Sequence, residues 1–266
     1  MKKTQIIWMV FALFISIMIF SLLNHVPPVK AHNHKPNNEA EHKELKETIL
    51  ETAMSSLSKE NQLKCDSLIK DNDYKSLAMV FEKSNQFDAA MYAYIQLSKS
   101  LETERDLLFV GKKLVNSLKF IESPVIKEQG ARVAKSIYDD LVKRDTTNSA
   151  YQVGLAGCYI EGLNDIMTGV TILKKILETE PNHVHANFQL GRLGIVSGQF
   201  DKAISRLKVV VRQDPKDIDA LLYLADSHIG LKQNDQAVNY LKQASDLIEN
   251  PELKFKIGKY IEELIN

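Results

Sequence analysis

The feature that most constrains the fold is a spacing of 34 residues in the second half of the chain. Gly157, Gly191 and Ala225 follow one another at this interval, as do Pro181 and Pro215. Small residues at equivalent positions let one helix lie close against another, and a proline ends a helix because it cannot donate the helical hydrogen bond. The period therefore predicts helix-turn-helix units, which must stack because no single unit can bury its apolar face.

The second helix of each unit is read from a recurring amphipathic segment. "GQFDKAISRLKVVVRQDPKD" (198–217) is similar to "NQFDAAMYAYIQLSKSLETE" (85–104) and to "QNDQAVNYLKQASDLIENPE", which begins at Gln233. Ala203 and Leu207 are four residues apart and so share one helical face. Leu173 and Leu241 stand 34 residues on either side of Leu207. We expect these leucines to be buried between helices.

These segments resemble the tetratricopeptide repeat family, most clearly at 150–183, 184–217 and 218–251. The Trp typical of the first helix is absent, because Val153, Asn187 and Leu221 stand there, and the family's Tyr is also replaced. The resemblance implies an all-α, right-handed solenoid with a concave groove that binds proteins. It implies about five repeats, including 71–104 and a longer, irregular one at 105–148, whose extra residues we place at 121–130.

Both ends of the repeat array are expected to be covered by helices. Residues 44–70 read as an N-terminal helical cap. After Pro251, residues 252–266 read as a closing helix, since an open solenoid end needs a cap with a polar outer face. The apolar residues assigned to its packing face are Phe255, Ile257, Tyr260, Ile261 and Leu264.

The first 24 residues are interpreted as a membrane anchor. Residues 6–23 form an uncharged apolar run, which as a helix would span about 27 Å, close to the roughly 30 Å hydrocarbon core of a bilayer. Lys2 and Lys3 favour a cytoplasmic N-terminus. The repeats are then expected outside the cytoplasm, on the periplasmic side of an inner membrane crossed once. The alternative is a signal peptide cleaved near Ala31, which would release the repeats into the periplasm.

Residues 25–43 are rich in Pro, Asn and His and are expected to form a flexible spacer. His25, His32, His34 and His42 could together capture a metal ion, which leaves a metal-handling protein as one alternative function. No Cys or carboxylate accompanies them at ligand spacing, so we assign no metal site. We also expect no cofactor, no small-molecule substrate and no catalytic residues, because no nucleophile–base or paired-carboxylate arrangement stands out.

Composition restricts the partners further. Lys plus Arg and Asp plus Glu both total 34, so there is no basic excess of the kind that nucleic-acid binding requires. Cys65 and Cys158 are the two cysteines. We expect two buried free thiols, because their helices lie several units apart and a disulfide needs Cα atoms within about 7 Å.

We therefore expect a membrane-anchored, non-catalytic adaptor that binds a protein or peptide partner and takes part in assembling or chaperoning envelope complexes. Self-association of the array is a second alternative. In a helix-turn-helix stack the first helices line the groove, and Arg192 and Asp226, 34 residues apart, are expected to face each other. The residues predicted to contact the partner are Tyr151, His185, Phe188, Arg192, Ile195, Leu222 and Asp226.

Overall fold

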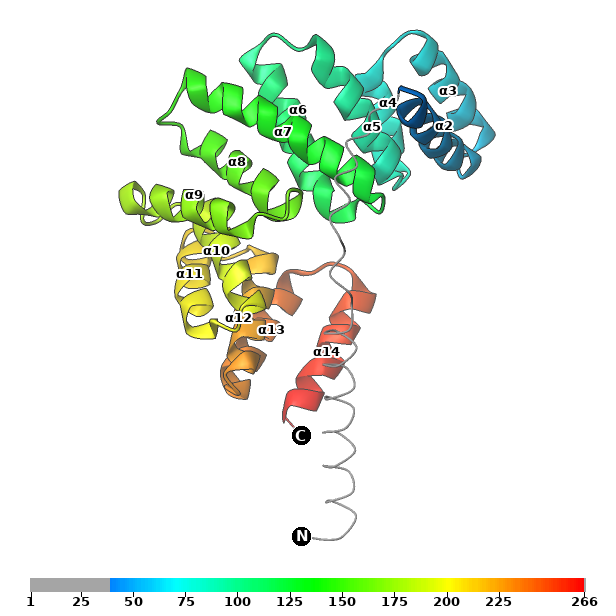
Figure 1. Cartoon of the computed structure of the whole chain (residues 1–266). Helices are drawn as coiled ribbons and strands as arrows, with labels where there is room; N and C mark the ends of the chain where they lie inside the picture. The colour runs from blue at the N-terminus through cyan, green and yellow to red at the C-terminus, as the bar shows by residue number, and fades with distance from the viewer. Residues whose placement is uncertain (1–38, 266) are drawn as a thin grey trace, which may run out of the picture. The chain divides into compact units, whose positions relative to one another are not determined.

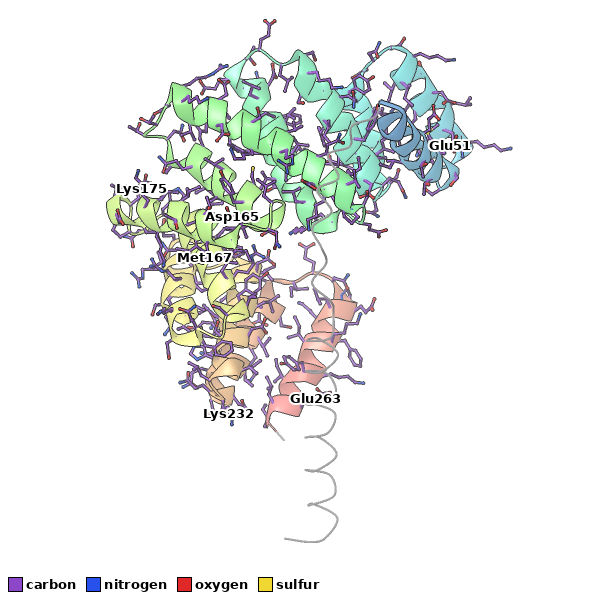
Figure 2. The ribbon with its side chains drawn as sticks, in the orientation of Figure 1. Glu51, Asp165, Met167, Lys175, Lys232 and Glu263 are labelled. Atoms are coloured by element: carbon purple, nitrogen blue, oxygen red, sulfur yellow. The ribbon has the colours of Figure 1, made fainter. Side chains whose placement is uncertain are left out.

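The computed structural model describes residues 39–265, and within them all regular structure is helical, with no β-strand. The described residues from 49 onward belong to one compact unit, and residues 39–48 are assigned to another. Figure 1 shows the helices in chain order, and Figure 2 shows the same view with side chains. They are α2 (Glu39–Ser55), α3 (Lys59–Lys70), α4 (Tyr74–Lys83), α5 (Phe87–Leu97), α6 (Glu104–Ser117), α7 (Pro124–Arg144), α8 (Ser149–Glu161), α9 (Ile166–Thr179), α10 (Val184–Val196), α11 (Phe200–Gln213), α12 (Ile218–Gly230), α13 (Asn234–Leu247) and α14 (Pro251–Ile265).

From α4 onward the helices pack as consecutive hairpins, α4 with α5, α6 with α7, α8 with α9, α10 with α11 and α12 with α13. Leu173 and Leu207 are fully buried and Leu241 is 3% exposed, which confirms their expected place between helices. The first helices α10 and α12 each begin after a residue whose side chain caps the helix. The Nδ1 of His183 accepts the Ala186 amide at 3.2 Å, and Asp217 accepts the Ala220 amide at 2.9 Å.

The equivalent small residues are used in two ways. A Cβ on Gly191 would lie 2.7 Å from Cγ of Leu207 on α11, the second helix of its own hairpin. A Cβ on Gly157 would instead lie 2.7 Å from Val115 of α6, the preceding first helix. Close helix approach therefore explains both glycines, but only Gly191 has the expected neighbour.

The irregular second hairpin takes up its extra residues as helix. α7 runs for 21 residues from Pro124 to Arg144, so the segment 121–130 is mostly helical. Pro124 occupies the first turn, where its missing N–H costs nothing, and the Ser123 hydroxyl accepts the Ile126 amide at 3.4 Å. Gly130 lies inside α7, where a Cβ would come within 2.3 Å of Sδ of Met91 on α5. It marks a close contact between two second helices.

Two expectations for the ends of the array differ from the structure, one on where a helix begins and one on which residues it buries. α2 begins at Glu39, inside the range 25–43 predicted to be a spacer, because "EAEHK" contains the good helix formers Glu, Ala and Lys. In α14, Ile257 is buried and Ile261 and Leu264 pack beside it. Phe255 and Tyr260, however, are 64% and 39% exposed. The five residues were predicted to lie mostly on one face, and Phe255 and Tyr260 are the two that the structure leaves exposed.

The predicted anchor, residues 6–23, lies outside the described residues, as does most of the predicted spacer. Within residues 39–265, no helix combines the length and apolar character that a bilayer-spanning helix needs. Both cysteines belong to the described part of the chain, and both are buried free thiols.

Candidate functional site

The candidate site is the set of side chains that α8, α10 and α12 present at four equivalent positions, which we call the first-helix surface. Each position recurs at the 34-residue spacing, so the three helices can be compared directly. The members are Tyr151, His185 and Asp219; Gly154, Phe188 and Leu222; Cys158, Arg192 and Asp226; and Glu161, Ile195 and Ile229.

On α8 most of this surface is covered by the long helix α7. A Cβ on Gly154 would lie 2.1 Å from the ring of Tyr138, so the ring rests directly on the α8 backbone. Cys158 is fully buried, and its Sγ donates to the Gly154 carbonyl at 3.3 Å. Burial raises the pKa of this thiol to about 12. Of the four α8 positions, the one that Glu161 occupies remains accessible to a partner.

Tyr151 is correspondingly unavailable for binding, contrary to the prediction. Its side chain is 4% exposed, and its hydroxyl donates a hydrogen bond to the Glu104 carboxylate at the start of α6. This hydrogen bond is the main reason that the pKa of Tyr151 is raised. Tyr151 therefore joins two first helices and contributes to stability.

Phe188 and Leu222 are half-buried rather than free. Phe188 packs against the core formed by Ala203, Leu207 and their neighbours, and its ring meets Tyr223 edge-on with the centroids 5.7 Å apart. Leu222 packs against the core cluster that contains Leu241 and Ile257. Both residues hold hairpins together and show a partner only part of their apolar surface.

Arg192 was expected to face Asp226. In the structure it pairs instead with Glu161 of the preceding first helix. Its guanidinium also donates to Oε1 of Gln189 at 3.0 Å. Glu161 and Arg192 are 31 residues apart, and an ion pair with the same separation joins Glu82 to Lys113 at 2.7 Å. Side chains on neighbouring first helices therefore meet diagonally, three residues short of the repeat length.

By this diagonal spacing, the residue that faces Asp226 from α10 is Ile195, which cannot neutralise a carboxylate. Asp226 is exposed and forms no hydrogen bond or ion pair within residues 39–265. Partial desolvation by the surrounding protein raises the pKa of its carboxyl group. Ile195 and Ile229, which are both half-buried, flank it. The geometry thus presents an unpaired negative charge between two apolar side chains.

His185 is exposed at the start of α10. Its ring lies edge-on to His183, with the centroids 6.3 Å apart, and His183 is occupied as the helix cap. His185 therefore lies at the margin of the first-helix surface, ten residues before Ile195, the α10 residue that faces Asp226.

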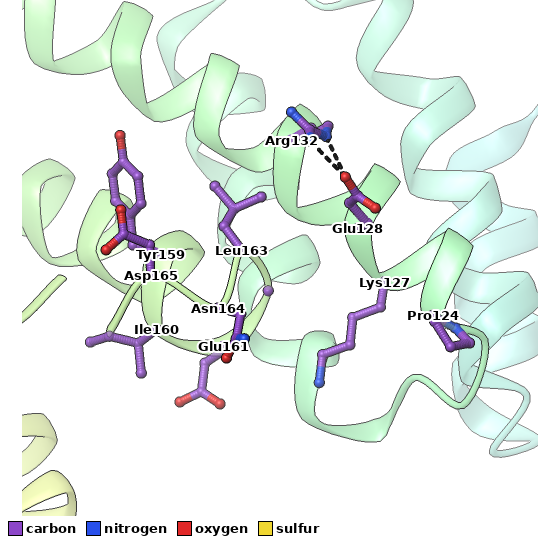
Figure 3. Close-up of a pocket in the computed structure, with 11 residues that line it drawn as sticks. Pro124, Lys127, Glu128, Arg132, Tyr159, Ile160, Glu161, Leu163, Asn164 and Asp165 are labelled. Carbon is purple, nitrogen blue, oxygen red and sulfur yellow. Dashed lines mark hydrogen bonds and ion pairs between the residues drawn. The ribbon is translucent and has the colours of Figure 1, made fainter. Parts of the chain in front are cut away.

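A separate cavity of about 770 Å³ opens between the start of α7 and the turn from α8 to α9. Figure 3 shows its charged side chains. Arg132 is paired with Glu128 at 2.6 Å, and Glu161 is held by Arg192. Asp165 accepts the Thr168 amide as the cap of α9. With these charges engaged, Lys127 is the lining cation without an ion pair among the described residues, which is too little to define a ligand.

The described residues contain no cluster of three His, Cys, Asp or Glu side chains able to hold a metal ion. His25, His32 and His34 lie outside these residues, and only the backbone of His42 is described. The metal-handling alternative therefore stays a prediction.

The comparisons with known proteins address the repeats. Residues 195–254 match the tetratricopeptide repeat family. The matched segment begins near the end of α10 and contains the whole of α11, α12 and α13, so it includes Asp226 and both flanking isoleucines. Over 117 residues the chain is 30% identical to lipopolysaccharide assembly protein B of Haemophilus influenzae. The aligned segment covers 42% of this chain and 30% of that protein. The chain thus spans less than a third of the relative's length.

Two solved structures are similar to this chain at lower identity. MamA is 22% identical, with a TM-score of 0.43, and the alignment covers 65% of this chain and 89% of MamA. YrrB, described as a TPR protein with an unusual peptide-binding site, is 20% identical with a TM-score of 0.42. That alignment covers 73% of this chain and 97% of YrrB.

Two residues of the surface were not among the predicted contacts. Tyr223 supports Phe188 by its ring contact, and Gln189 holds the Arg192 guanidinium. Both follow a predicted residue by one position in the sequence. Gln189 lies three residues before Arg192 on one helix, a spacing that itself predicts contact. The separation of 31 residues between opposite charges would have identified Glu161 as the partner of Arg192.

Proposed function

We propose that this protein binds a protein or peptide partner on the part of the first-helix surface formed by α10 and α12. The observation that carries the proposal is Asp226, an accessible carboxylate with no internal partner and a raised pKa. Such a group costs free energy in the free protein, because partial desolvation without pairing disfavours the charge. A partner that supplies a cation would recover part of that cost.

The chemistry of the surface defines the partner class. Asp226 would pair with a Lys or Arg side chain, and Ile195 and Ile229 would contact an apolar residue next to it. Arg192 is already neutralised by Glu161, so it supports the surface rather than attracting an anionic ligand. We propose a segment that carries a basic residue beside an aliphatic or aromatic one, since such anchors dominate protein interfaces.

The proposal extends to location and role. Residues 6–23 would anchor the chain in the inner membrane, and the repeats would form a right-handed solenoid on the periplasmic side. The similarity to lipopolysaccharide assembly protein B supports a role in assembling an envelope complex. The protein would act by binding alone, without catalysis.

The binding proposal is tested by Asp226→Asn with Asp246→Asn as its matched control. Both residues are exposed aspartates, but Asp246 lies on the second helix α13. Proteins crosslinked in cells to each variant are compared with those of the wild type. We expect Asp226→Asn to lose the partner and Asp246→Asn to retain it. Equal partner recovery from both variants would contradict the binding site.

The location is tested separately. In osmotically opened cells with an intact inner membrane, added protease should digest the repeats while the protein fractionates with membranes after carbonate washing. Protection of the repeats until the inner membrane is broken would refute the periplasmic assignment. Release by carbonate would refute the anchor.

A further inference from the structure

The last helix, α14, has the features of a first helix. Oδ1 of Asn250 accepts the amides of Glu252 at 2.9 Å and Leu253 at 3.2 Å, so Asn250 caps α14 as His183 and Asp217 cap α10 and α12. Counting eight residues from these caps gives Gly258 in α14, Gly191 in α10 and Ala225 in α12. α14 therefore corresponds to the first helix of a sixth hairpin.

The side of α14 that a second helix would cover is open. In α10, the site of Gly191 is filled by Leu207 of α11, and in α12, Ala225 is buried in one cluster with Leu241 of α13. A Cβ on Gly258, by contrast, would meet nothing within 4 Å. Within residues 39–265 no further helix follows α14, which Figure 1 shows as the last ribbon of the chain.

The open side carries a regular pattern. Pro251, Gly258 and Ile265 are spaced seven residues apart, and at 3.6 residues per turn they share one face. Phe255, which is 64% exposed, and Ile265, which is 67% exposed, lie on this face. We call it the α14 stripe, and its members are Pro251, Lys254, Phe255, Gly258, Ile261, Glu262 and Ile265.

The α14 stripe is complementary to itself in the antiparallel direction. Gly258 is the midpoint of α14, which runs from Pro251 to Ile265. A two-fold axis through Gly258 would place Lys254 against the Glu262 of a second copy. It would also place Phe255 against the part of the second copy's half-buried Ile261 that its own core leaves exposed. The half of the helix before Gly258 contains Lys254 and Lys256 with Glu252, whereas the half after it contains Glu262 and Glu263 with Lys259, so the two halves differ in the sign of their net charge.

We propose that two copies of this chain associate through antiparallel contact of their α14 helices, with Gly258 at the two-fold axis. Each α14 would then occupy the place that a second helix holds in the other hairpins. Gly258 allows the close crossing, since it has no side chain to separate the backbones. The antiparallel arrangement also brings together helix ends of opposite dipole charge, and a two-fold contact uses the same patch on both copies.

A contact between two helices of 15 residues buries less area than a standard interface of about 1,600 Å². We therefore expect a weak dimer that depends on concentration. The first-helix surface around Asp226 lies on other helices, so this proposal and the proposed function can fail independently.

The decisive experiment introduces one cysteine into the full chain. Gly258→Cys should form a disulfide between two copies under mild oxidation, because residues at the axis come within the roughly 7 Å Cα separation that a disulfide allows. Lys256→Cys is the matched control, since it is exposed on the same helix but points away from the stripe. The native cysteines are buried, so they do not compete.

We expect a covalent dimer from Gly258→Cys and none from Lys256→Cys. No dimer from Gly258→Cys, or equal yields from both variants, would overturn the proposal. The fold is checked by circular dichroism, and Gly258→Cys should retain it because the added side chain enters open space.

A charge exchange tests the same geometry without a crosslink. Lys254→Glu should weaken dimerisation in sedimentation equilibrium about tenfold, or about 1.4 kcal/mol, because it sets like charges opposite each other. Adding Glu262→Lys to the same chain should restore the dimer. A wild-type chain that is monomeric at all concentrations, or a double variant no better than the single one, would contradict the antiparallel register.

Discussion

Gly191→Ala is expected to destabilise the protein, although alanine is the better helix former. The new Cβ would lie 2.7 Å from Cγ and 3.0 Å from Cδ2 of Leu207. Leu207 is fully buried, so it cannot move into solvent to relieve the clash. Overpacking of this kind costs about 1–3 kcal/mol, whereas replacing a helical glycine by alanine contributes about 0.5–1 kcal/mol. The net expectation is a loss centred on about 1 kcal/mol, with an upper limit of about 2.5 kcal/mol.

Gly258→Ala is the matched control, because it makes the same change at the equivalent position of α14. A Cβ there has nothing within 4 Å, so only the helix propensity acts, and we expect a gain of about 0.5–1 kcal/mol. The two variants should thus change stability in opposite directions. This comparison cancels the effect of glycine on the unfolded chain, which both substitutions share.

The assay is urea unfolding followed by circular dichroism, at a concentration low enough to keep the chain monomeric, with hydrogen exchange of α14 and α10 measured in parallel. Hydrogen exchange is needed because the repeats of a stacked array can open locally. Gly191→Ala should lower the midpoint with little change in slope. If it matched or exceeded the wild type in stability, the close contact with Leu207 could not be what holds α10 against α11.

Three further predictions concern single side chains. Asp226→Asn should stabilise the free protein slightly at neutral pH. The carboxyl pKa is raised in the folded protein, so the ionised group costs stability above its unfolded pKa. An unchanged or lower thermal midpoint would argue against the desolvation. Cys158 should resist alkylation in the native state, and its raised pKa of about 12 against 9.0 should reduce stability by about 1.4 kcal/mol per pH unit between these values. Cys158→Ala should flatten that alkaline decline, and an identical pH profile would contradict it. Tyr151→Phe should lower the midpoint of chemical denaturation slightly, because it removes the hydrogen bond to Glu104, an exposed carboxylate that water can then solvate. An unchanged midpoint would mean that the hydrogen bond adds nothing.

The hairpins could be predicted because their signal is periodic, and the long α7 could not because its signal is ambiguous. Pro124 and Gly130 look like helix breakers in sequence. In the structure the proline begins the helix and the glycine admits Met91. Proline is common both in the first turn of a helix and in loops, so its presence in the sequence does not distinguish the two. Only the packing of α5 against α7 decides between them.

The candidate site was predictable as a surface but not as a set of pairs. Equivalent residues repeat every 34 positions, so Arg192 and Asp226 were expected to meet. Neighbouring first helices are offset, however, and the observed ion pairs join residues 31 positions apart. The offset depends on how the helices pack against one another, which the repeat period alone does not contain. The same offset leaves Asp226 opposite Ile195.

The long α7 also determines where a partner can bind. Its Tyr138 lies on Gly154 of α8, and Cys158 is buried beneath the same helix, so α8 loses the surface that α10 and α12 keep. The one accessible charge left on α8, Glu161, neutralises Arg192. Of the residues at the third equivalent position, one is therefore covered and one is paired, and Asp226 alone stays available to a partner. Under the proposed function, Asp226 would then select a partner with a basic residue, and Asp219, a second exposed carboxylate of the first-helix surface, would add to the negative charge of α12.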